Sequence, residues 1–176
     1  MAEACTVPPC DWRTSTLRPR SRRSWHAPPM SSANVATIRE LYAQLMGPGC
    51  MEDQANIEVV PRFFADDVEL LQMRSILGTG GRFLGHRGVV ESTSEILRDF
   101  ADAMFLPEEV RAVGDQVGTA VLFRGKGRRS GAPVEIRVGH LFTLRDALIV
   151  RWEVFEDSGA ALDAAGAVGE GSEGPA

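Results

Sequence analysis

The spacing of hydrophobic residues is helical near the start of the chain and strand-like in its second half. Apolar side chains recur three and four residues apart at Val35, Ile38, Leu41, Tyr42 and Leu45. This spacing places them on one side of a helix, which Ser31 or Ser32 can cap. Gly47-Pro48-Gly49 cannot continue a helix, so we expect the first helix to end there.

The middle of the chain mixes helical patterns with short apolar runs. We expect a helical segment at 54–64, a short strand at 68–73, a Gly-rich loop at 77–85 and a helix at 87–100. Pro61 disfavours a helix interior, so the first of these segments should break into two short pieces. Asp66-Asp67 should form a turn before the strand, and Phe100 lies on the expected buried side of the last helix.

Only strand patterns follow, rich in Val, Leu, Ile, Phe and Trp. The expected strands cover residues 109–113, 117–124, 134–144 and 148–155, with turn residues between them. Helices followed by consecutive strands predict an α+β domain, in which the helices gather on one face of a mostly antiparallel sheet.

The two ends of the chain differ in composition from the domain between them. Residues 1–29 contain Pro pairs and Arg clusters without an apolar period, and residues 166–176 are rich in Gly and Glu. We expect both ends to be disordered, which leaves one domain at residues 30–165. Residues 1–29 have three interpretations: an extension upstream of a natural start at Met30, a basic interaction arm, or a targeting peptide.

Composition and charge exclude several classes of function. The chain of 176 residues has a net charge of −5, so we expect no nucleic-acid partner. It contains no run of about 18 apolar residues, so we expect no membrane span. The three cysteines, Cys5, Cys10 and Cys50, suggest no disulfide framework or metal cluster. Without a secretory pattern at the start, the expected location is the cytoplasm.

No sequence motif predicts a cofactor, a metal ion or a nucleophilic serine. The glycines at 78 and 80 would need a further glycine at position 83 to form a phosphate loop, and that residue is Phe83. The three histidines are far apart, and Gly-x-Ser-x-Gly does not occur. The adjacent carboxylates Asp66 and Asp67 could serve acid and base roles, but a turn is their more ordinary interpretation.

His140 is the strongest candidate functional residue. Strand alternation places it on one face with five apolar residues, Val134, Ile136, Val138, Phe142 and Leu144. Either this face is solid core and a neighbour satisfies the imidazole, or the face lines a cavity. In a cavity, an imidazole that titrates near neutral pH is a suitable general acid or base.

Other candidate residues lie on neighbouring segments. Residues 148–155 present either Trp152 or Glu153 to His140, depending on which face they share. Tyr42 lies on the apolar side of the first helix, where its hydroxyl needs a partner if buried; otherwise it is an amphipathic core residue with a solvated hydroxyl. Gln72, on the short strand, is either a polar site residue or an exposed edge residue.

The chain from about residue 34 to residue 166 resembles the SnoaL-like polyketide-cyclase branch of the nuclear transport factor 2 superfamily. The matching stretches are LYAQL, RFFADDVEL, RFLGHRGV, GHLFTLRDALIVRWEVFED and ALDAAG. The superfamily also includes ketosteroid isomerase and limonene epoxide hydrolase. The resemblance implies a cone-shaped α+β fold, with a curved, mostly antiparallel sheet wrapped around an N-terminal helical layer.

The resemblance also implies roles for individual residues. In SnoaL-type cyclases, an acid/base aspartate occupies the position of His140. The active-site tyrosine of ketosteroid isomerase matches Tyr42, while its base aspartate falls on Gln72 and its second acid on Gly139, so steroid isomerisation is not expected. The Asp-Arg-Asp set of limonene epoxide hydrolase falls on Phe123, Val121 and Val154, so that activity is not expected either.

These observations lead to one expected function and one alternative. We expect a cofactor-independent homodimer of secondary metabolism that binds a hydrophobic polyketide- or terpenoid-like small molecule and cyclises, isomerises or dehydrates it. His140 would be the acid/base and Tyr42 and Gln72 would orient the substrate, between walls formed by Phe64, Met73, Phe142 and Trp152. The alternative is a non-catalytic ligand-binding or dimerisation module of the same fold.

Overall fold

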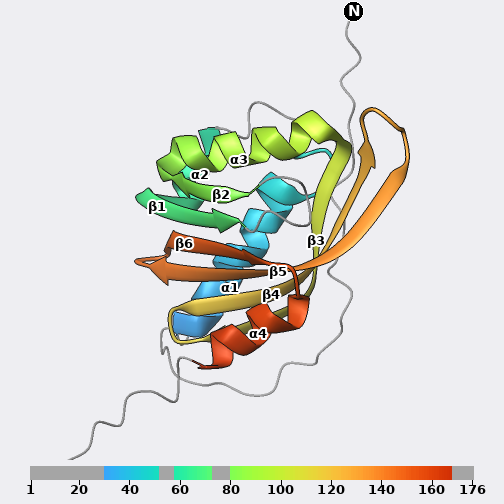
Figure 1. Ribbon diagram of the computed structural model, residues 1–176. Helices are drawn as coiled ribbons and strands as arrows, with labels where there is room; N and C mark the ends of the chain where they lie inside the picture. The colour runs from blue at the N-terminus through green and yellow to red at the C-terminus, as the bar shows by residue number, and fades with distance from the viewer. Residues whose placement is uncertain (1–29, 52–57, 73–79, 168–176) are drawn as a thin grey trace, which may run out of the picture.

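A curved, unclosed sheet of six strands forms the frame of the protein (Figure 1). This computed structural model describes residues 30–51, 58–72 and 80–167. The strands are β1 (Phe64–Gln72), β2 (Gly81–Leu84), β3 (Phe100–Val113), β4 (Gln116–Gly127), β5 (Pro133–Arg145) and β6 (Leu148–Phe155). Their order is β2-β1-β6-β5-β4-β3, and all neighbours are antiparallel except β1 and β6. The predicted α+β class with a curved, mostly antiparallel sheet is therefore confirmed.

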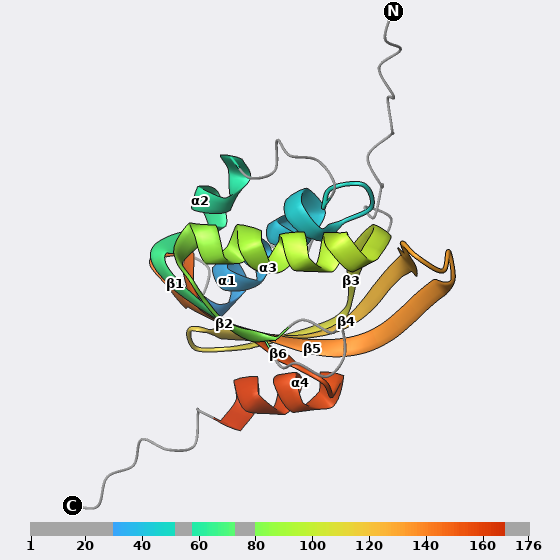
Figure 2. The same cartoon turned by 45° about the horizontal axis from the view of Figure 1, so that its top comes forward.

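Helices cover both faces of the sheet. They are α1 (Met30–Leu41), the π-helical turn η1 (Tyr42–Met46), α2 (Val60–Phe63), α3 (Gly85–Asp99) and α4 (Ser158–Ala167). α1 and α3 lie on the concave side, whereas α4 lies against the opposite, convex side (Figure 2). The prediction that the helices gather on one face is therefore wrong for α4. Its Ala- and Gly-rich sequence gave no amphipathic pattern of large side chains.

The first helix is confirmed, and its end has an unusual geometry. Ile38 and Leu41 are completely buried, as their spacing predicts. From Tyr42 the backbone continues as the wider π-helical turn η1, a feature that is frequent at functional sites. Gly47 then has an extended conformation and ends the helical segment. The π-turn carries Tyr42 into the core, where its side chain is 3% exposed.

The predicted start of the strand at residue 68 and the predicted turn at Asp66-Asp67 are both wrong. β1 begins at Phe64, so Asp66 and Asp67 lie within the strand and do not form a turn. Both are exposed, and the pairing of β1 with β6 shifts register across them, so an irregular strand accommodates two adjacent carboxylates.

The predicted helical break at Pro61 is reflected in α2, which spans only four residues with Pro61 in its first turn.

Two predictions around the Gly-rich segment are also wrong. Part of the predicted loop at 77–85 is β2, which pairs with β1 in antiparallel fashion. α3 then begins at Gly85, whose φ of +65° allows a strand to lead directly into a helix. Residues 77–79 of that loop, Met73, residues 54–57 and the predicted disordered end at 1–29 lie outside the described residues. Of the other predicted disordered end, 166–176, residues 168–176 lie outside them, whereas Gly166 and Ala167 are the last residues of α4.

β3 is much longer than the predicted strand at 109–113, because it begins at Phe100. Phe100 is therefore a strand residue and not part of the preceding helix. Two register shifts, near Asp102 and near Pro107, interrupt the pairing of β3 with β4, and Asp102 has a positive φ of 53°. These irregularities allow Pro107 to lie in an edge strand.

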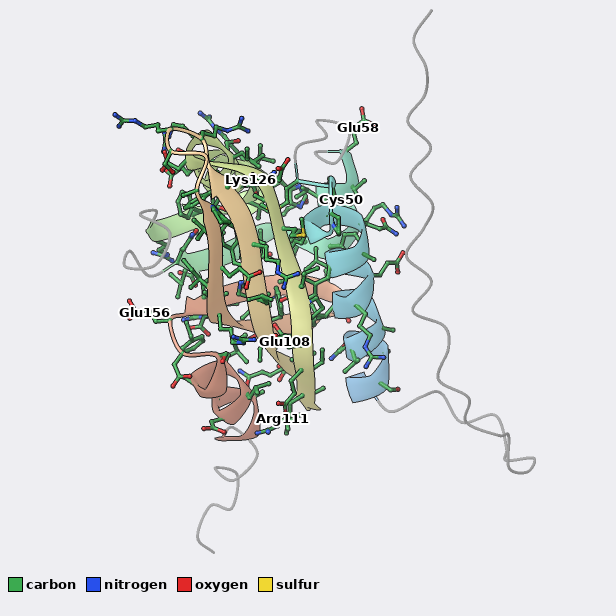
Figure 3. All side chains as sticks on the ribbon, turned by 90° about the vertical axis from the view of Figure 1, so that its right-hand side faces the viewer. Cys50, Glu58, Glu108, Arg111, Lys126 and Glu156 are labelled. Atoms are coloured by element: carbon green, nitrogen blue, oxygen red, sulfur yellow. The ribbon has the colours of Figure 1, made fainter. Side chains whose placement is uncertain are left out.

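The long strands β3, β4 and β5 carry exposed charged pairs, whose members Glu108 and Lys126 are labelled in Figure 3. Glu108 on β3 accepts hydrogen bonds from Arg137 on β5 at 2.9 and 3.1 Å, and Lys126 pairs with Asp102 at 2.8 Å. Exposed pairs of this kind contribute at most about 1 kcal/mol each to stability. Charges on an edge strand also oppose pairing with another sheet.

Two glycines on the convex face allow α4 to approach the sheet. A Cβ atom on Gly118 of β4 would overlap the backbone carbonyl of Ala161 in α4. A Cβ atom on Gly139 of β5 would lie 2.6 Å from the Cβ of Ala161 and 2.8 Å from the carbonyl oxygen of Asp157. Ala161 is completely buried, so small residues on both elements form the contact. This packing covers the convex face of β4 and β5.

The variant Gly118→Ala tests this packing. Because backbone atoms of α4 would have to move, we expect the free energy of unfolding to fall by about 2 kcal/mol, as measured by urea denaturation. The matched control is Gly125→Ala in the same strand, where the added Cβ would come no closer than 3.3 Å to a side-chain atom. Equal stability of the two variants would contradict the proposed close contact.

Candidate functional site

A row of polar and apolar residues crosses the concave face of the sheet at His140. His140 of β5 pairs with Thr119 of β4 on one side and with Val154 of β6 on the other. Val154 in turn pairs with Gln72 of β1. Residues that pair directly lie on the same face, so the side chains of this row all belong to the concave face. Gln72 is two strand spacings from His140, which is about 10 Å.

Tyr42 binds the two polar side chains at the centre of this row. Its hydroxyl lies 2.8 Å from Nδ1 of His140 and 2.8 Å from Oγ1 of Thr119. Thr119 Oγ1 also lies 3.4 Å from the backbone carbonyl oxygen of His140. Thr119 is 0%, His140 1% and Tyr42 3% exposed. The three side chains therefore satisfy one another inside the core.

The directions of these hydrogen bonds determine where the imidazole carries its proton. The carbonyl oxygen of His140 can only accept, so Thr119 donates to it and accepts from Tyr42. The only proton of the Tyr42 hydroxyl is then used, and Nδ1–H of His140 donates to the hydroxyl oxygen. In the opposite arrangement the Tyr42 hydroxyl would donate to an unprotonated Nδ1, and the imidazole proton would be on Nε2. The described residues provide no acceptor for a proton on Nε2. The network therefore favours an unprotonated Nε2.

Aromatic rings enclose the imidazole. Phe105, Phe142 and Trp152 have ring centroids 5.3, 5.9 and 5.2 Å from that of His140. Phe64 extends this enclosure, because its ring stacks on Trp152 at 6.1 Å. The surroundings of the polar network are therefore apolar, and electrostatic interactions within it are stronger than in water.

Burial changes the acid–base properties of the two titratable groups. Desolvation disfavours the imidazolium ion and lowers the pKa of His140 from 6.5 to about 3. Desolvation also raises the pKa of Tyr42 above its ordinary value, and the hydrogen bond with Thr119 opposes part of that effect. Both groups are therefore neutral at pH 7. The site is a neutral hydrogen-bonded network with a free imidazole lone pair at Nε2.

The structure brings most of the predicted site residues together. Tyr42 and His140 are in direct contact, and Trp152, not Glu153, shares the face of His140. The predicted wall residues Phe64 and Phe142 are completely or almost completely buried beside Trp152. Gln72 lies on the same face two strands away, and Met73 lies outside the described residues.

Thr119 and Phe105 are site residues that the sequence interpretation missed. Thr119 had the same signal as His140, because it is a single polar residue among Val117, Val121 and Phe123 on one strand face. Phe105 was missed because residues 100–108 were not recognised as strand.

One correspondence with ketosteroid isomerase is wrong. Position 139 matched the second acid of that enzyme, but Gly139 faces Ala161 of α4 on the convex side. An acid at position 139 could not reach Tyr42. Position 140 is the one that faces the concave side.

Two other findings concern the described residues. None of their helices is both long and apolar enough to cross a membrane. Within the same ranges, no cluster of three or more His, Cys, Asp or Glu side chains is arranged to hold a metal ion.

The chain is similar to proteins of one superfamily. A family model described as a SnoaL-like domain matches residues 50–152. A protein from Jannaschia sp. CCS1 described as a SnoaL-like polyketide cyclase is 17% identical, with a TM-score of 0.62 over 75% of this chain and 90% of that chain. No curated protein matches.

Two further solved structures have the same architecture. TerC, co-crystallised with polyporic acid, is 24% identical, with a TM-score of 0.60 over 74% of this chain and 98% of that chain. A protein from Catenulispora acidiphila with a ketosteroid isomerase-like fold, in complex with trimethylamine, is 14% identical, with a TM-score of 0.57 over 74% and 92% of the two chains. At these identities the likeness shows the fold alone.

The pKa of His140 predicts acid-sensitive stability. Because the folded-state pKa of about 3 lies below the unfolded value of 6.5, the unfolded chain binds one more proton between these pH values. The contribution of neutral His140 to the free energy of unfolding is therefore fully present above pH 6.5 and is lost as the pH falls toward the folded-state pKa. We expect urea denaturation to show a loss of about 2 kcal/mol between pH 6.5 and pH 5 that His140→Asn lacks. The same pH dependence in both proteins would contradict this assignment.

The hydrogen-bond network predicts the tautomer of His140. In ¹⁵N-labelled protein at pH 7, Nδ1 should have the chemical shift of a protonated ring nitrogen and Nε2 that of an unprotonated one. The variant Thr119→Val removes the group that orients the Tyr42 hydroxyl, so the Nδ1–H form should lose its preference. A proton on Nε2 in the unaltered protein would show that the network runs in the opposite direction.

Proposed function

Because the chain belongs to the SnoaL-like domain family, we propose that it catalyses proton transfer on a hydrophobic small molecule, with His140 as the acid/base. The main supporting observation is the buried hydrogen bond between Tyr42 and His140, which occupies Nδ1 and leaves Nε2 as the ring nitrogen that can act on a substrate. The relative described as a SnoaL-like polyketide cyclase supports a polyketide-like substrate class, and TerC, co-crystallised with polyporic acid, supports a small organic molecule as the ligand. Cyclisation, isomerisation and dehydration all begin with such a proton transfer.

In this proposal Tyr42 and Thr119 act on the base and not on the substrate. The Tyr42 hydroxyl accepts from Nδ1 and holds the imidazole plane, while Thr119 fixes the direction of the Tyr42 proton. The lone pair of Nε2 then removes a proton from an acidic C–H group. Tyr42 and Thr119 are therefore positioning residues, and this role of Tyr42 differs from the one that the resemblance to ketosteroid isomerase implied.

The low pKa of His140 limits which substrates can react. An isolated imidazolium is unfavourable in these surroundings. A substrate that becomes an enolate keeps its negative charge beside the imidazolium, and this charge favours the protonated ring. We therefore propose that the substrate carries a carbonyl group next to the carbon that loses its proton. If the negative charge instead departed with a leaving group, it would not stabilise the imidazolium, and proton removal by His140 would stay unfavourable.

A non-catalytic ligand-binding module of the same fold is the second candidate. The observation that favours it is the near-complete burial of His140, because a packed network of Tyr42, Thr119 and His140 also stabilises the core without any chemistry. The predicted homodimer is compatible with both candidates and stays a prediction.

Hydrogen–deuterium exchange tests the proposal without knowledge of the natural substrate. The protein is incubated in D₂O with β-tetralone, an apolar ketone with acidic C–H groups, and deuterium incorporation is followed by NMR. We expect exchange above the buffer rate, and a loss of roughly 100-fold or more in His140→Asn. Tyr42→Phe should retain part of the exchange, because the ring stays in place while the hydrogen bond to Nδ1 is lost.

The matched control is Arg137→Gln, an exposed residue of the same strand β5 whose side chain pairs with Glu108. It should exchange the ketone at the original rate. Binding of β-tetralone without exchange in the unaltered protein would favour the non-catalytic module. Exchange that survives in His140→Asn would refute the role of His140.

A further inference from the structure

The indole N–H of Trp152 is a buried donor without an identified acceptor. Trp152 is 6% exposed, and among the described residues its Nε1 has no hydrogen-bond partner. An indole nitrogen can only donate, and an unmade hydrogen bond of a buried donor costs about 1–3 kcal/mol. A folded protein rarely keeps such a donor without a partner, so it calls for an explanation.

The position of this donor is held by packing on both sides. Phe142 stacks against the indole with ring centroids 5.6 Å apart and an angle of 28° between the ring planes. Phe64 stacks against it at 6.1 Å and 27°. The backbone of Trp152 pairs with Phe142 on one side and with Leu70 on the other. Because stacking and strand pairing both fix the ring, the N–H is preorganised.

Trp152 is also close to the proposed base. Its indole ring is nearly perpendicular to the imidazole of His140, with centroids 5.2 Å apart. A ligand that contacted the imidazole of His140 would therefore lie next to the indole ring. The Tyr42 hydroxyl is less suited to bind a substrate oxygen, because its proton is directed to Thr119 and its oxygen accepts from His140.

From these observations we propose that Trp152 donates its indole N–H to the carbonyl oxygen of the substrate, and that the site selects planar, apolar ketones. This inference rests on the proposed function of His140 as a base. Nε2 removes a proton from the carbon next to the carbonyl, and the C–H electron pair forms the C=C bond of the enolate. The carbonyl oxygen receives the negative charge, and the Trp152 N–H stabilises it. The imidazolium then returns its proton to carbon.

Two ligands of equal shape test whether the donor meets an oxygen. β-Tetralone carries a carbonyl, whereas tetralin has the same bicyclic skeleton without it. In ¹H–¹⁵N spectra of the full chain, the indole N–H proton of Trp152, assigned from Trp152→Phe, should shift downfield with β-tetralone. Tetralin should cause a smaller shift without the downfield change. Equal responses to both ligands, or no response of this resonance to β-tetralone, would overturn the inference.

The rate of deuterium exchange into β-tetralone shows whether Trp152 acts as a hydrogen-bond donor to the substrate or only as a structural residue. Replacement of Trp152 by 3-benzothienylalanine keeps the ring shape and substitutes sulfur for the N–H group. We expect this variant to bind tetralin unchanged and to exchange β-tetralone roughly 100-fold more slowly, the size of effect seen when one donor to an oxyanion is removed. An unchanged exchange rate would show that the N–H does not stabilise the enolate.

The outcomes also distinguish this inference from the proposed function. If His140→Asn abolishes exchange while the benzothienyl variant retains it, His140 is the base and the role of Trp152 is refuted. If β-tetralone shifts the indole resonance and the unaltered protein catalyses no exchange, Trp152 is a ligand donor in a non-catalytic module. In that case the proposed function fails and the donor assignment stands.

Discussion

The hydrogen bond between Tyr42 and His140 joins the helical layer to the sheet at the centre of the protein. Tyr42 comes from the π-helical turn that follows α1, whereas His140 and Thr119 are paired residues of β5 and β4. Each of these polar groups would be costly to bury alone, and together they satisfy one another. The helix can therefore pack in only one register against the sheet without leaving a polar group unpaired. The same constraint fixes the imidazole and so defines the site.

Much of this arrangement could be predicted from the spacing of residues. A single polar residue on an apolar strand face indicated His140, and the helical period placed Tyr42 on the buried side of the first helix. Both signals are local, because alternation and helical period depend only on neighbouring residues. The resemblance to a family then supplied the curved, mostly antiparallel sheet. The parallel pairing of β1 with β6 was not predicted, because no local pattern reveals it.

What the sequence did not predict depends on contacts between distant segments. The start of β3 at Phe100 requires bulges that accommodate Asp102 and Pro107, and such bulges form only against a partner strand. α4 packs through Ala161 onto glycines of two strands, so its stability comes from a close approach rather than an apolar stripe. Thr119 was recognisable from its own strand, but its importance follows from a partner 77 positions away.

Burial of His140 has two opposite effects on its chemistry. It lowers the pKa of His140 from 6.5 to about 3, which makes the imidazole a poor base when no negative charge is nearby. The same surroundings strengthen the attraction between an imidazolium and a nearby negative charge. At 4 Å and an effective dielectric constant of about 20, this attraction is about 4 kcal/mol, or about three pKa units. A bound enolate would therefore restore most of the lost basicity, whereas a molecule that forms no such anion would not. Burial thus makes the base depend on its substrate, and the aromatic enclosure of His140 becomes a source of selectivity.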